Sequence, residues 1–128
     1  MGRPRNPSAP YSRFRAGMPG QPQAIVLPPY CDLPVPPVPP HVEDLWDDAQ
    51  RARWESLWES PQANLWDSSA AATVAVLVTY ERAILEGTAS AWQAQEWRYA
   101  SAALGLTPEA LQKLNWTIQE EEDAEDAA

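Results

Sequence analysis

The sequence predicts a small all-α domain of about four helices, with a disordered proline-rich arm before it and an acidic disordered tail after it. Twelve of the 14 prolines lie before residue 41, and proline inside a helix removes a hydrogen bond. After that point apolar residues recur at three- and four-residue steps, with almost no period-two alternation. The last nine residues hold six acidic side chains and no basic one. We therefore expect an arm over residues 1–41, a helical oligomerisation domain over 42–119 and a tail over 120–128.

The arm is expected to be extended and basic. Prolines restrict their own backbone and that of the preceding residue, so the run over residues 33–40 favours polyproline II. At about 3.1 Å per residue, this run forms a stiff spacer of roughly 25 Å. Such a run is alternatively a ligand for an aromatic-lined groove. Four arginines against Asp32 alone make the arm basic, whereas the whole chain has a net charge of −9.

The first helix is predicted over residues 44–58. One stripe of this helix, at three- and four-residue steps, contains Trp46, Gln50, Trp54, Leu57 and Trp58. Acidic residues lead the helix, as its dipole favours. Ser60 and Pro61 are typical of an N-cap and a first helical residue, and they predict a short turn over 62–66.

Two longer helices follow. Asp67 is a suitable N-cap for a helix over residues 68–86, which Gly87 closes in the left-handed conformation. The first half of this helix is apolar on nearly all sides, so we expect it to pack against more than one neighbour. Ser90 fits a capping box and begins a third helix, which runs to about Leu104.

Thr107 and Pro108 repeat the cap-plus-proline signal and predict a fourth helix over residues 109–119. Leu111, Leu114 and Ile118 lie on one side of this helix. No β-strand is expected in the proline-poor part of the chain.

Composition excludes several classes of protein. The longest apolar stretch, residues 70–78, is about half the ~20 residues of a membrane-spanning helix. The apolar segment at 24–27 is shorter than the ~7–15-residue core of a signal peptide. Cys31 and His41 are the only cysteine and histidine, so neither a disulfide within the chain nor an ordinary Cys/His metal site is expected. We expect a cytoplasmic protein without metal or cofactor.

Catalysis is not expected. His41 lies in the proline-rich run, where nothing orients it as a general base. The carboxylates of the first helix occupy its beginning or its polar side, and no glycine falls in a phosphate-binding loop motif. The chain is therefore interpreted as a non-enzyme.

Three sets of residues are candidates for binding. Arginines on an extended arm bind phosphates or enter a narrow minor groove, so the candidate DNA-binding residues are Arg3, Arg5, Arg13 and Arg15. The alternative for them is a solubilising tail. Tryptophan is enriched at the centres of interfaces, and the candidate subunit-interface residues are Trp46, Trp54, Trp58, Trp92 and Trp97, unless they form the core. The acidic tail is either a solvated end or an electrostatic site for a basic partner, formed by Glu120, Glu121, Glu122, Asp123, Glu125 and Asp126.

Three stretches together resemble a known family. The first is the Gly-Arg-Pro segment at residues 2–7 with the Gly-Met-Pro-Gly turn within 15–22. The second is the Trp-Glu-Ser-Leu-Trp segment within 54–63, and the third is the Gly-Leu-Thr-Pro corner within 105–110. In this order and spacing, they resemble the small subunit of phage terminase, the DNA-packaging complex of tailed bacteriophages, in the form found in phages of actinobacteria. One departure is that only Lys113 is basic after the Thr-Pro corner, so a DNA-binding role for the last helix is not expected.

The resemblance implies a non-catalytic subunit that assembles as a homo-oligomeric ring. It also implies binding to viral double-stranded DNA at the packaging start site, and recruitment and regulation of the large ATPase-nuclease subunit. On this interpretation the tryptophans build the ring, the arginines bind DNA and the acidic tail engages the large subunit. The protein would act in the cytoplasm of the infected bacterial host, outside the mature virion, with no membrane or small-molecule partner.

Two other functions are kept as alternatives. One is a helical protein-interaction adaptor without DNA binding, and the other is a structural head protein of the same kind of phage. A helix-turn-helix reader across residues 87–88 is not expected, because the third helix has no basic side chain before Arg98 to contact base edges.

Overall fold

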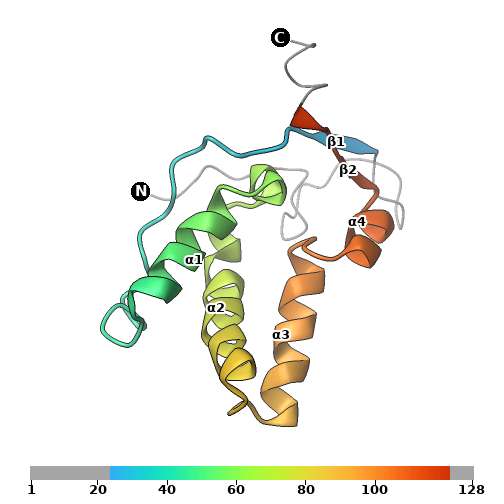
Figure 1. Ribbon diagram of the computed structural model, residues 1–128. Coiled ribbons are helices and arrows are strands. Elements are labelled where there is room, and N and C mark those ends of the chain that lie inside the picture. Colours follow the sequence, from blue (N-terminus) through green and yellow to red (C-terminus); the bar gives the residue numbers. More distant parts are fainter. Residues whose placement is uncertain (1–23, 122–128) are drawn as a thin grey trace.

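The computed structural model describes residues 24–121. Its four α-helices are α1 (Asp48–Trp58), α2 (Ala71–Glu86), α3 (Ala91–Ala103) and α4 (Pro108–Leu114). Two 3-10 turns, η1 (Pro61–Leu65) and η2 (Ser68–Ala70), lie between α1 and α2, and two short strands are β1 (Ile25–Leu27) and β2 (Trp116–Ile118). Helices α2 and α3 form an antiparallel hairpin, α1 lies beside α2, and α4 and the strands lie at the open end of the hairpin (Figure 1). The predicted fold class, a small domain of four helices, is confirmed.

Polar side chains and glycines set the helix boundaries. A capping box at Ser90 begins α3, as the sequence predicts, and Gly87 ends α2 with a φ of 78°. The helix predicted from residue 44 instead begins at Asp48, because Asp47 forms the capping box: its side chain accepts a hydrogen bond from the Gln50 amide. The four residues before Asp48 therefore lie outside the helix that was predicted for them.

The fourth helix is shorter than predicted. It ends at Leu114, and Asn115 adopts the left-handed conformation with a φ of 60°. Trp116, Thr117 and Ile118 then form β2, which pairs in parallel with β1. The expectation of an α-helix to residue 119 was wrong, because asparagine tolerates the left-handed conformation that ends a helix.

The described part of the proline-rich segment packs against the helices. The amide of Cys31 donates to the carbonyl oxygen of Glu59 at 2.9 Å, and Trp54 Nε1 donates to that of Pro36 at 2.8 Å. Val35 and Val38 contact the core, and their spacing of three residues matches the three residues per turn of polyproline II. Residues 24–41 therefore form a strap over α1, where the sequence suggested a free spacer.

The core is built around tryptophan. The main cluster joins side chains from the strap, α1, α2 and α3, with Trp54, Trp58 and Trp66 nearly inaccessible to solvent. A second cluster contains Leu27, Leu65 and Trp116, with residues of α4 packed against it. The second cluster fastens the two strands to the end of the helical hairpin.

Candidate interaction surfaces

Three of the five tryptophans expected at a subunit interface lie inside the single chain. Trp46, Trp54 and Trp58 are 5%, 1% and 0% exposed. Their rings form a row that continues to Trp66, with successive centroid separations of 5.7, 5.6 and 5.3 Å. Trp46 Nε1 also donates to Thr79 Oγ1 at 3.1 Å. These three tryptophans pack in the core, so they have little surface to offer a second copy.

Trp97 lies at the edge of this core and is partly exposed. Its Nε1 donates to the carboxylate of Glu81 at 3.3 Å, and the same carboxylate accepts from Arg53 Nε at 2.8 Å. Glu81 therefore links α1 to α3 across α2. This geometry gives Trp97 a structural role in fixing the three helices.

Trp92 is the exposed member of the set, at 59%. It packs edge-on against Tyr80 with ring centroids 5.9 Å apart, at the loop end of the α2–α3 hairpin. Further along the same two helices lies a shallow hollow of about 320 Å³, lined by Ala72, Thr73, Val76, Glu96, Tyr99, Ala100 and Ala103. Val76 and Tyr99 are 38% and 59% exposed. We call this surface, from Trp92 to Ala103 and across to Ala72, the hairpin face.

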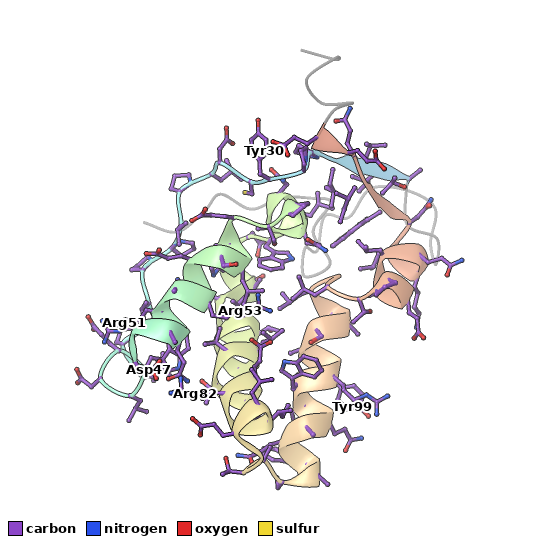
Figure 2. The ribbon with its side chains drawn as sticks, viewed as in Figure 1. Tyr30, Asp47, Arg51, Arg53, Arg82 and Tyr99 are labelled. Atoms are coloured by element: carbon purple, nitrogen blue, oxygen red, sulfur yellow. The ribbon has the colours of Figure 1, made fainter. Side chains whose placement is uncertain are left out.

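Val76 and Tyr99 are not among the interface residues that were predicted from the sequence. Positions 72, 76 and 80 on α2, and 92, 96, 99 and 103 on α3, follow helical spacing. That spacing is the available signal, but it does not distinguish a buried stripe from an exposed one. Figure 2 shows Tyr99 projecting away from α3 into solvent.

The beginning of α1 is acidic, and one carboxylate there is paired. The guanidinium of Arg82 on α2 contacts Asp47 and also pairs with Glu86 at 2.5 Å. Asp47 and Arg82 point toward one another in Figure 2. The hydrogen bond from Arg82, followed by that from the Gln50 amide, lowers the pKa of Asp47. Hydrogen bonds to the carboxylates of Asp47 and then Glu86 raise the pKa of Arg82, so the pair of Asp47 and Arg82 is fully charged at neutral pH.

The other predicted site residues are mostly outside the described part. The candidate DNA-binding residues Arg3, Arg5, Arg13 and Arg15 precede residue 24, and four of the six tail acids follow residue 121. Glu120 and Glu121 are described, and both are exposed. They lie just beyond β2. The residue between them and this strand, Gln119, donates its amide hydrogen to the Leu27 carbonyl oxygen of β1 at 2.7 Å.

Neither a metal centre nor a membrane span is found within residues 24–121. No three side chains of the types His, Cys, Asp and Glu come together there in a group able to hold a metal ion. No helix in this part is long and apolar enough to cross a membrane.

The family model described as phage terminase small subunit matches residues 13–128. Searches against curated proteins and against solved structures gave no match.

Proposed function

Because the chain belongs to the phage terminase small-subunit family, we propose that it is the non-catalytic subunit of a complex that packages viral DNA. The family match over residues 13–128 is the observation that carries this proposal. In this role the protein acts in the cytoplasm of the infected bacterium, binds viral double-stranded DNA and recruits the large ATPase-nuclease subunit. It is absent from the mature virion.

DNA binding is assigned to the N-terminal arm. Four of the nine basic residues lie within the first 15 positions, while the chain carries 18 acidic residues. Of the described cations, Arg53 and Arg82 are already paired with carboxylates. An acidic helical body repels phosphates, so Arg3, Arg5, Arg13 and Arg15 are the groups suited to meet them.

Assembly is assigned to the hairpin face. Trp46, Trp54 and Trp58 are buried in the monomer core, whereas Trp92, Tyr99 and Val76 are exposed together on the hairpin face. Exposed aromatic side chains around a shallow hollow are typical of interface centres. A ring of such copies would display many arms together, and their combined binding to DNA would exceed that of one arm.

The acidic tail is assigned to the large subunit. Glu120 and Glu121 are exposed, and the remaining acids of the tail follow them in sequence. A run of carboxylates attracts a basic surface and raises the association rate more than the final affinity.

The test is a fluorescence-anisotropy titration of labelled double-stranded DNA with the full chain at several salt concentrations. We expect the logarithm of the binding constant to fall with that of the salt concentration, with a slope of about −0.9 for each phosphate contacted. Replacing Arg3, Arg5, Arg13 and Arg15 with alanine removes binding, whereas replacing the same four with lysine retains most of it. Absence of binding at every salt concentration contradicts the DNA-binding role and favours the adaptor function. Binding that changes neither with salt nor with these substitutions contradicts the assignment of DNA binding to the arm.

A further inference from the structure

The corner between α3 and α4 carries two adjoining hollows. One, of about 660 Å³, is lined by Trp97, Arg98, Tyr99, Ser101, Ala102, Thr107, Pro108 and Glu109. The other, of about 370 Å³, is lined by Ala102, Ala103, Thr107, Glu109, Ala110, Lys113 and Leu114. The two hollows share Ala102, Thr107 and Glu109, so they adjoin at these residues. We call the two together the corner groove.

The groove contains two of the described cations that form no ion pair within residues 24–121. Arg98 lines one hollow and Lys113 the other, and within residues 24–121 neither forms an ion pair. By contrast, Arg53 and Arg82 are paired with carboxylates, and Arg51 donates to the backbone carbonyl of Glu43. Glu109 also lines the groove, so two cations face one carboxylate there. This is a local positive balance on a chain whose net charge is −9.

The rest of the lining suits a peptide segment. Tyr99 is 59% exposed, and Pro108 is exposed beside it, so the groove has apolar walls next to its two cations. The Thr107 hydroxyl is already used as the acceptor for the Ala110 amide. A ligand would therefore rely on carboxylates that pair with Arg98 and Lys113, with its backbone lying against the ring of Tyr99.

We propose that the corner groove binds the acidic segment 120–126 of a second copy of this chain. This segment supplies six carboxylates within seven residues, the charge that the groove lacks. Because Gln119 still pairs with β1, the chain is held at the sheet as far as that residue. In Figure 1, β2 runs from α4 toward the top of the view, away from the corner between α3 and α4. Glu120 and Glu121, the described acids of the segment, therefore follow the end of β2 that lies farther from their own corner groove, which favours the groove of a neighbour.

When fully extended, the seven residues of the acidic segment 120–126 span at most roughly 23–25 Å. The tail would thus have two alternative partners, and the large subunit would have to displace it from the neighbouring groove. This inference rests on the assembly part of the proposed function, because it requires copies to associate.

Lys113 makes a direct test possible, since it is the only lysine in the chain. A carbodiimide joins an amine to a carboxylate in contact with it without adding a spacer. Equal amounts of ¹⁴N- and ¹⁵N-labelled full-length protein are mixed, cross-linked and analysed by mass spectrometry. We expect linked peptides in which Lys113 of one isotope is joined to a tail carboxylate of the other isotope. Raising the salt concentration lowers their yield.

Two matched variants give the control. Arg98→Glu reverses a charge in the corner groove and is expected to lower the yield of mixed-isotope cross-links at least fivefold. Arg51→Glu makes the same change on α1, outside the groove, and leaves the yield unchanged. Circular dichroism confirms that both exposed variants are folded.

Light scattering separates failure of this inference from failure of assembly. If the protein is a monomer at every concentration, both the proposed assembly and this inference are contradicted. If the protein is an oligomer but Lys113 is cross-linked only within its own chain, the proposed binding of the tail to a neighbour's groove is wrong. The same holds if the mixed-isotope yield is equal in the two variants. Neither result contradicts assembly.

Discussion

Gly105 lies directly against the indole ring of Trp116. A Cβ atom placed on Gly105 would be 2.4 Å from Cζ3 of that ring, and the glycine has a φ of 75°. Gln62 Nε2 also donates to the Gly105 carbonyl oxygen at 3.0 Å. The end of α3 and the beginning of β2 are thus in contact at a position where only glycine fits.

Gly105→Ala is expected to destabilise the protein by about 2–5 kcal/mol. The left-handed backbone costs roughly 1–2 kcal/mol for a residue with a Cβ, and the displaced indole adds about 1–3 kcal/mol. Urea unfolding followed by tryptophan fluorescence measures the loss. Gly87→Ala is the matched control, because its φ is 78° but its Cβ would meet nothing within 4 Å. Equal losses in the two variants would contradict the contact.

Trp54→Phe is expected to loosen the strap and expose Cys31. The substitution removes the hydrogen bond to the Pro36 carbonyl oxygen, while Cys31 is 4% exposed in the intact protein. Breaking one buried hydrogen bond costs about 1–3 kcal/mol when the acceptor is left unpaired. Reaction of the single thiol with a chromogenic disulfide should therefore accelerate several-fold. Trp92→Phe, which lies far from the strap in sequence and is exposed, should leave the rate unchanged.

Trp92→Ala is expected to weaken self-association without unfolding the chain. Trp92 is 59% exposed, so little core packing is lost, but a large aromatic group leaves the hairpin face. Truncating a central aromatic residue of an interface typically costs about 2 kcal/mol or more. Light scattering over a dilution series measures the mass in solution. On dilution, the variant should dissociate at a higher protein concentration than the parent protein does. Leu85→Ala is the control, being 79% exposed and absent from the lining of the hollow.

The ion pair between Asp47 and Arg82 should contribute stability that depends on pH. A carboxyl whose pKa is lowered in the folded state stabilises the fold above its unfolded pKa, here close to 3.8. This contribution is lost as the pH falls through the lower folded pKa. Asp47→Asn keeps a good N-cap, so its deficit relative to the parent reports the pair. The deficit in the free energy of unfolding should be present at pH 6 and shrink below about pH 4. A deficit that is constant down to pH 2 would show that the pair does not contribute.

Local signals in the sequence were sufficient for most of the helical part. Ser90, Gly87 and the Thr107-Pro108 pair lie where the caps and ends of the helices are found, because these residues act on their immediate backbone. The two strands were missed because three residues show no periodicity, and β1 pairs with a segment about ninety positions away. That pairing is decided by tertiary packing around Trp116.

The candidate surfaces were only partly predictable. Helical spacing places Trp54 and Trp92 equally well on an inward stripe, but Trp54 is covered by the strap, whereas Trp92 contacts Tyr80 of α2 and remains exposed. The strap itself was interpreted as a spacer because prolines alone predict stiffness, whereas Val35 and Val38 between them supply the apolar contacts. Exposure of Tyr99 depends on which element lies opposite α3, which the residues of α3 do not specify.

The parallel pairing of β1 with β2 has a mechanical consequence. Ile25 pairs with Trp116 and Leu27 with Ile118, so the basic segment joins the ribbon at one end and the acidic segment leaves it at the other. These two points are separated by only two residue steps, roughly 7 Å. Tension on either charged segment therefore loads the same few hydrogen bonds. A partner that pulls on one segment would shear the ribbon and loosen the anchor of the other, which couples the two ends of the chain through three pairs of residues.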